Sequence, residues 1–150
     1  MTEIRKITEK DLQSFAVFVE ELKKDANAEL FSIDKVTDPV SWGRNGILLN
    51  ANKAGVFLIA EEEGKIIGFC NIFRKDGRHE CGIGLLSEFR GKRIGIEIIK
   101  AIIQEAKNIG IKKLYAGIKK ANKVSIDFFK FNGFKIAEKK EKSLLLRKTI

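Results

Sequence analysis

A short basic turn between an apolar run and an amphipathic run most constrains the fold of this chain. The turn, residues 89–96, reads FRGKRIGI and joins the strand-like run 81–86 to the helix-like run 94–109. This pattern predicts a strand, a tight turn and a helix. The first N–H groups of a helix have no partner inside it, and the helix dipole is positive at that end. The turn is therefore a candidate site for a polyanion such as a phosphate-bearing ligand.

The basic residues are concentrated in the half of the chain that contains this turn. The net charge is +9, of which residues 1–75 contribute −1 and residues 76–150 contribute +10. A basic field attracts free phosphates and nucleic acid alike. Charge alone therefore leaves both kinds of partner open.

The overall composition is typical of one soluble domain. The chain has 150 residues, 44% of them hydrophobic and 33% charged, which predicts a single domain over residues 1–150. We find no apolar run that could cross a bilayer and no secretion signal, so we expect a cytoplasmic protein without a membrane partner. Cys70 and Cys81 are too few for a disulfide framework, and with His79 as the single histidine we expect no metal site.

Alternating and helical spacings of apolar residues predict the order β-α-α-β-β-β-α-β-α-β-β. This order combines hairpins with crossovers, which is typical of an α+β fold with a mixed α/β sheet flanked by helices. The expected strands lie near residues 3–8, 56–60, 66–73, 79–86, 112–118, 134–138 and 143–147, and the expected helices near 12–26, 38–52, 94–109 and 122–131.

Two common phosphate-binding loops can be excluded. The dinucleotide fingerprint begins well at Gly82-Ile83-Gly84, but Ser87 stands where its third glycine belongs. A Walker loop needs glycine where this chain has Leu86, and Ser or Thr where it has Arg93. The basic turn must therefore belong to another class of phosphate site.

The turn and a second motif resemble the GCN5-related N-acetyltransferase (GNAT) superfamily, whose members bind acetyl-CoA. The family motif Gln/Arg-x-x-Gly-x-Gly/Ala is read here as Arg90 to Gly95, and residues 59–69 match a usual hairpin of the fold more weakly. The resemblance covers residues 55–147 and implies the GNAT-like acyl-CoA N-acyltransferase fold. The second motif is matched at the family spacing by Asn122, Ser125, Ile126, Phe128-Phe129 and Gly133-Phe134.

The resemblance implies a role for each matched residue. The backbone amides of residues 91–96 would hold the pyrophosphate, and the strand 83–86 would pair with the pantetheine arm as an added β-strand would. An amide near Leu85 or Leu86 would polarise the thioester carbonyl, and Asn122 would hold the cofactor from the opposite strand. The expected cofactor-binding residues are Ile83, Leu85, Leu86, Arg90, Gly91, Lys92, Arg93, Ile94, Gly95, Ile96, Asn122, Ser125 and Phe129.

The chain departs from the family pattern at two positions. Arg93 replaces the usual fourth-position glycine of the loop. Phe129 occupies the position of the tyrosine that often acts as general acid, and phenylalanine cannot donate a proton. Glu80 matches a glutamate that some members use as a base, although it could instead be a strand-end residue paired with Arg78 or Lys75.

The resemblance implies an acetyl-CoA-dependent N-acetyltransferase that acts on a primary amine of a small molecule or protein. Two alternatives remain: a CoA-binding relative with weakened catalysis, because of Phe129, and a basic nucleic-acid-binding module. Nucleic acid is the less favoured partner because the chain has no RNA-stacking aromatic motif and no helix-turn-helix. Acidic residues between 20 and 38 either form a solvated face or attract a cationic amine. A homodimer through the closing strands is a further expectation from fold relatives.

Overall fold

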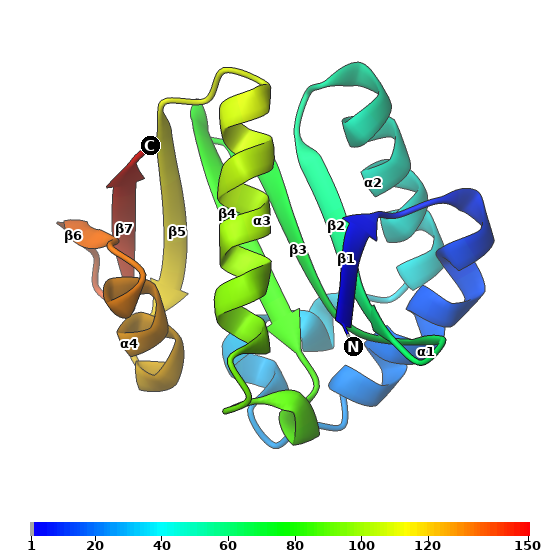
Figure 1. Ribbon diagram of the computed structural model, residues 1–150. Helices are drawn as coiled ribbons and strands as arrows, with labels where there is room; N and C mark the ends of the chain where they lie inside the picture. The colour runs from blue at the N-terminus through cyan, green and yellow to red at the C-terminus, as the bar shows by residue number, and fades with distance from the viewer. Residues whose placement is uncertain (1) are drawn as a thin grey trace.

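A seven-stranded mixed sheet runs through the molecule in the order β1-β2-β3-β4-β5-β7-β6 (Figure 1). The computed structural model describes residues 2–150, apart from the side chains of Leu30 and Phe31. The expected order of strands and helices is confirmed, and four short 3-10 turns are added to it. The elements are β1 (Thr2–Lys6), η1 (Glu9–Asp11), α1 (Leu12–Leu22), η2 (Ala28–Phe31), η3 (Ile33–Lys35), α2 (Pro39–Asn52), β2 (Val56–Glu62), β3 (Lys65–Lys75), β4 (Arg78–Leu85), η4 (Ser87–Phe89), α3 (Ile94–Asn108), β5 (Lys113–Lys119), α4 (Lys123–Phe131), β6 (Lys135–Lys139) and β7 (Ser143–Thr149).

One helix boundary differs from the expectation. We expected the first helix to reach Ala26, but α1 ends at Leu22, which is its last buried residue. Asp25 then accepts a hydrogen bond from the backbone N–H of Asn27 at 2.8 Å. This local turn competes with the helix and ends it, as short polar side chains commonly do.

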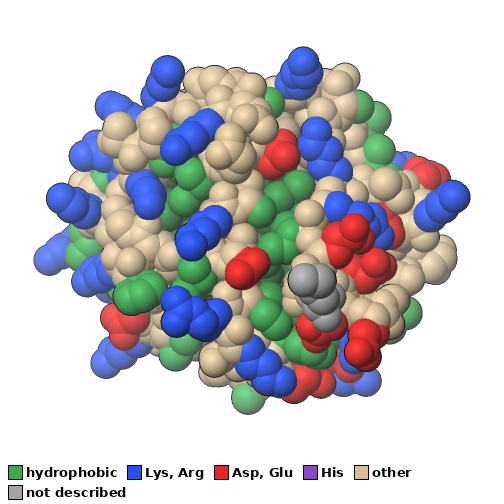
Figure 2. All heavy atoms as spheres, in the orientation of Figure 1, with side chains coloured by type: hydrophobic (Ala, Val, Ile, Leu, Met, Phe, Trp, Pro, Cys, Tyr) green, Lys and Arg blue, Asp and Glu red, His purple; other side chains and the backbone are tan. Residues whose placement is uncertain are grey.

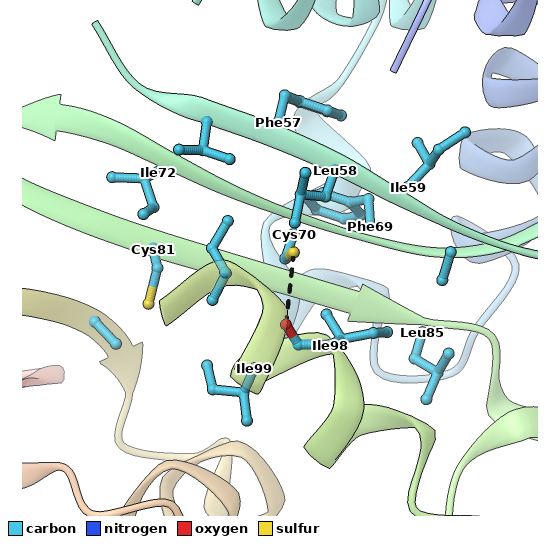
Figure 3. Packing of buried hydrophobic residues seen from close by; sticks show 14 of the residues in the cluster. Phe57, Leu58, Ile59, Phe69, Cys70, Ile72, Cys81, Leu85, Ile98 and Ile99 are labelled. Carbon is cyan, nitrogen blue, oxygen red and sulfur yellow. Dashed lines mark hydrogen bonds between the residues drawn. The ribbon is translucent and has the colours of Figure 1, made fainter. Parts of the chain in front are cut away.

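The two faces of the sheet are covered by different helices. The Cys70 Sγ points to the Ile98 carbonyl of α3, 4.0 Å away (Figure 3), whereas the Phe69 ring lies 5.0 Å from the Trp42 ring of α2. Adjacent residues of a strand point to opposite faces. Helix α3 therefore covers one face of the sheet, and α2 covers the other together with α1, whose Phe15 also packs on Phe69.

The core on the α1–α2 face is built from edge-to-face aromatic rings. The Phe15 and Phe57 rings lie 5.4 Å apart at 82°, and both are completely buried. A Cβ on Gly46 would lie 2.5 Å from the Phe57 ring, so glycine at this position lets α2 approach β2. Gly43 and Gly46 are therefore needed for close packing. Because they stand at buried positions, the apolar spacing that predicts a helix is weak in α2.

Cys70 and Cys81 are buried free thiols. Burial raises the pKa of Cys70 well above its ordinary value and raises that of Cys81 to about 12. Both side chains therefore stay protonated and act as small apolar core residues.

Asp11 links the start of the helical layer to β1. Both Asp11 carboxylate oxygens accept hydrogen bonds of 2.8 Å from the Arg5 guanidinium, and the Thr8 N–H and hydroxyl also donate to it. The Arg5 hydrogen bond lowers the pKa of Asp11 from 3.8 to about 2. The ionised carboxylate is thus a structural group at the β1–α1 junction.

The sheet splits between β4 and β5. These two strands are parallel, and within the described residues they pair at a single register position, Glu80 with Tyr115. Beyond it, β5 stays paired with β7 along its whole length, and β4 stays paired with β3. The carboxyl-terminal half of β4 therefore has an unpaired edge next to an opening in the sheet.

Basic and acidic side chains lie on different parts of the surface. Figure 2 shows Lys and Arg side chains spread over the side that carries α4, β6 and β7, and acidic side chains gathered beside β1. Within residues 2–150, no helix combines the length and the apolar character that a membrane span requires.

Candidate active site

The unpaired edge of β4 presents backbone groups to the opening. The Leu86 N–H donates to the Ile67 carbonyl of β3 at 2.9 Å, and the Gly82 N–H donates to the Asn71 Oδ1 at 3.1 Å. Backbone groups of an antiparallel strand alternate in direction. Those of Ile83 and Leu85 therefore point away from β3, into the opening. Of the two amides considered for the thioester carbonyl, that of Leu86 is engaged with β3, and that of Leu85 faces the opening.

The basic turn places a second set of amides at the end of this edge. Gly91 and Arg93 both adopt left-handed backbone conformations, with φ of 76° and 67°. In α3 the N–H of Glu97 donates to the Arg93 carbonyl at 3.3 Å, so the three preceding amides have no acceptor within the helix. These belong to Ile94, Gly95 and Ile96, and with the turn they form a cradle that suits an anion.

The side chain of Arg90 is held by two groups outside this cradle. Its Nε donates to the Leu85 carbonyl at 2.9 Å, and its Nη2 lies 3.0 Å from the Asp25 carboxylate. The Asp25 side chain is only 9% exposed, so this ion pair fastens the α1–η2 segment to the end of β4. The Lys92 ammonium lies 5.6 Å from the Phe89 ring centre, and Arg93 is exposed at the start of α3. Of the three basic residues of the turn, Arg93 directly precedes the free amides of α3 in the sequence.

Helix α4 lies against the start of α3 and borders the cradle on that side. A Cβ on Gly95 would lie 3.1 Å from the Phe128 ring, so glycine allows this close approach. Asn122 is buried, and its Oδ1 accepts a hydrogen bond of 3.2 Å from the Ser125 N–H, which caps α4. Its side chain oxygen therefore has a structural partner.

Phe129 lies in the core, in the last turn of α4. It is 3% exposed, and its ring packs edge-on to Phe128 at 5.5 Å and to Phe134 at 5.0 Å. This packing accounts for an aromatic residue at the position, with or without a hydroxyl group.

A pocket of about 440 Å³ opens on the other face of the sheet, beneath α2 and the η3 segment. Register places Glu80 opposite Phe73, so its side chain lies on the face of β3 that carries Phe69 and Phe73. Glu80 is 5% exposed and lines this pocket. A Cβ on Gly117 would lie 3.2 Å from its Oε1, so the carboxylate extends across the opening toward β5.

Glu80 has a cationic neighbour in Arg78. The Arg78 Nη2 lies 3.8 Å from the Glu80 Oε2, and the Arg78 guanidinium also lies 5.6 Å from the centre of the Tyr115 ring. The structure therefore contains both the ion pair expected for a structural strand-end glutamate and the pocket position expected for a base.

Sequence reasoning missed two residues of this site. Asn71 is a buried polar residue in an otherwise apolar strand, and that contrast could have indicated its bond to β4. Asp25 was considered only as one of the acidic residues between 20 and 38, because its partner Arg90 lies far along the chain. Residues 2–150 contain no group of three or more His, Cys, Asp or Glu side chains that could hold a metal ion.

Comparison with solved structures supports the fold. The chain matches PaiA N-acetyltransferase from Thermoplasma acidophilum, in complex with coenzyme A, with a TM-score of 0.81 at 23% identity over 100% of this chain and 99% of that one. It matches a ribosomal-protein-alanine N-acetyltransferase from Brucella melitensis with a TM-score of 0.77 at 24% identity, covering 99% of both chains. For the GNAT domain of S. lividans PAT the TM-score is 0.84 at 16% identity, over 99% and 90% of the two chains.

A family comparison reaches the same result from sequence. No curated protein matches the chain significantly. The model of the acetyltransferase (GNAT) family matches residues 17–134, which include α2, the strands around the opening, the basic turn and all of α4. The resemblance read from the two motifs is thereby confirmed, and the chain belongs to the acetyltransferase (GNAT) family.

Proposed function

We propose that this protein is an acetyl-CoA-dependent N-acetyltransferase, formed by residues 1–150 as one domain, that acetylates a primary amine. One observation carries the proposal: β4 separates from β5 directly after Glu80. The open edge of β4 therefore lies between the anion cradle at α3 and the pocket that contains Glu80. A ligand on that edge would be reached from the pocket through the opening in the sheet.

The groups on the α3 side suit the cofactor. Acetyl-CoA supplies an acetyl group activated as a thioester. The amides of residues 91–96 and the charges of Lys92 and Arg93 would bind its pyrophosphate. The backbone of Ile83 and Leu85 would pair with the pantetheine arm. The Leu85 carbonyl keeps one lone pair beside its bond from Arg90, and the Leu85 N–H would polarise the thioester carbonyl.

Glu80 would act as the base on the pocket side. An amine is protonated near neutral pH and must lose a proton before its nitrogen can attack a carbonyl carbon. The Glu80 carboxylate would accept that proton, directly or through water. Phe129 can supply no proton to the leaving sulfur. A thiol pKa of about 8.5 makes such help dispensable at a cost in rate.

A CoA-binding protein with weakened catalysis is the second candidate. It is favoured by the burial of Phe129 and by the Arg78 guanidinium near Glu80. Both candidates suit the cytoplasm, since free buried thiols are typical of reducing compartments.

Calorimetry with acetyl-CoA and a thiol-release assay with an amine panel test the proposal. Glu80→Gln should keep the acetyl-CoA affinity within about twofold and lower kcat/KM by roughly 10²–10⁴. Glu138→Gln, on the exposed strand β6, is the matched control. Normal binding without turnover of any amine would favour the second candidate, and absence of acetyl-CoA binding would refute both.

A further inference from the structure

The pocket around Glu80 joins an apolar interior to a basic rim. Its apolar lining comes from both sides of the opening and from the helical layer above it. Three lysines line the same pocket, one from each of β3, β5 and the β6–β7 turn: Lys75, Lys119 and Lys140. A volume of about 440 Å³ suits a small molecule rather than a folded chain. The apolar residues are Ile33, Val36, Trp42, Phe69, Phe73, Ile118, Leu144 and Leu145.

The positive charge of this rim is not neutralised within the described structure. None of the three lysines forms an ion pair with a carboxylate of residues 2–150. The Lys119 ammonium donates to the Glu29 backbone carbonyl at 2.6 Å, which is a neutral partner. The acidic residues of the lining are Asp76, which lies 3.9 Å from the Arg78 guanidinium, and Glu80.

Three acidic residues of the α1–α2 segment are engaged elsewhere, whereas Glu29 and Asp34 form no ion pair within residues 2–150. Asp25 is paired with Arg90, Glu21 lies 3.2 Å from the Lys65 ammonium, and Asp38 caps α2 through the Ser41 N–H. The part of this segment that lines the pocket is Ser32, Ile33 and Val36, all uncharged. The segment therefore places no carboxylate in the lining of the pocket.

We propose that the acceptor is a small amine with an apolar or aromatic body and a carboxylate or phosphate group. This inference rests on the proposed function, since it assigns the amine to Glu80. The anionic group binds at the lysine rim, and the apolar body lies against the aromatic side chains of the lining, Trp42, Phe69 and Phe73. Such an acceptor matches the Glu80 carboxylate, the apolar lining and the lysine rim at once. A diamine would instead place its second positive charge among the lysines, which repel it.

Three ring compounds test this assignment, because they share one aminomethyl group and differ in the opposite substituent. They are 4-(aminomethyl)benzoate, benzylamine and 1,4-bis(aminomethyl)benzene. We expect kcat/KM to fall in that order, with the carboxylate about tenfold above benzylamine. Tenfold is about 1.4 kcal/mol, which exposed ion pairs with two of the lysines can supply. The tenfold preference should shrink at high salt.

A triple variant connects the preference to the rim. Lys75→Gln, Lys119→Gln and Lys140→Gln together should reduce the ratio of carboxylate to benzylamine kcat/KM about tenfold. The control carries Lys135→Gln, Lys139→Gln and Lys142→Gln, which change the net charge equally at exposed positions outside the pocket, and it should keep the ratio.

The outcomes separate this proposal from the proposed function. Equal rates for the three compounds, or a preference for the diamine, would overturn the anionic acceptor and leave acetyl transfer intact. Turnover of a peptide N-terminus above all three would also overturn it. If calorimetry shows acetyl-CoA binding but none of the three compounds reacts, the acceptor assignment is wrong. If acetyl-CoA does not bind, the proposed function itself fails.

Discussion

Arg93 allows a sharp test of the basic turn, because its backbone and its charge have separable effects. Arg93 has φ of 67°, a conformation that costs a residue with a side chain about 1 kcal/mol and glycine almost nothing. Arg93→Gly removes this strain, but it also makes the unfolded chain more flexible, which costs about 0.4–1 kcal/mol. Arg93→Ala removes the charge and keeps most of the strain.

We therefore expect the free energy of unfolding of the glycine variant to exceed that of the alanine variant. The relief of strain contributes about 1 kcal/mol, and the greater flexibility of the unfolded glycine variant reduces this difference. For a domain of this size, a net difference of about 0.5 kcal/mol raises Tm by roughly 1–2 °C. Both variants lose one exposed charge beside the helix amides, so both should bind acetyl-CoA about three- to tenfold more weakly. Differential scanning calorimetry measures the first effect and titration calorimetry the second.

Lys53 is the matched control. It ends α2 with φ of 53°, so Lys53→Gly and Lys53→Ala should reproduce the stability difference without changing acetyl-CoA affinity. Equal stability of the two Arg93 variants would refute the strain argument. Unchanged affinity in both would show that the Arg93 charge does not act on the cofactor.

Two other positions give further predictions. The pKa of Asp11 is depressed to about 2, so its contribution is fully present above the unfolded value of 3.8 and is lost as pH falls through 2. Urea unfolding should therefore show a loss of about 2 kcal/mol between pH 4 and pH 2 that is missing in Asp11→Asn; a parallel slope in both proteins would contradict this. Phe129→Tyr should raise kcat in the thiol-release assay by up to about tenfold, because it restores a proton donor. An unchanged kcat together with a lower Tm would show that the hydroxyl is buried without a partner and plays no part in the reaction.

Local patterns in the sequence were sufficient for the order of elements and for the position of the turn. Apolar periodicity depends only on which face of a helix or strand is buried, so α3 and β4 could be predicted closely. The end of α1 could not, because it depends on a side-chain turn at Asp25 that competes with a continuing helix. Propensity favours the helix, and only the tertiary contact of Asp25 with Arg90 shows why the turn is kept.

The candidate site was predictable where residues are neighbours in sequence and less so where folding brings them together. Residues 90–96 and Asn122 could be assigned from motif spacing. The pocket could not, because its walls come from β3, β4, β5, β7 and the η3 segment, which meet only through the strand order of the sheet. For the same reason the partners of Glu21, Asp25 and Asp38 became visible only in the structure.

Arg90 and Arg93 together explain the main departure of this chain from the family motif. A cation is useful near a pyrophosphate, and the first motif residue would be its natural source. Here the Arg90 guanidinium is held by the Leu85 carbonyl and by Asp25, so its charge is balanced by a carboxylate. Arg93 carries a cation to the start of α3, at a backbone position that glycine would occupy without strain. If the Arg93 charge acts on the cofactor, it offsets the cost of a left-handed arginine. We therefore expect Arg90 to fasten the α1–η2 segment and Arg93 to supply the cation for the pyrophosphate.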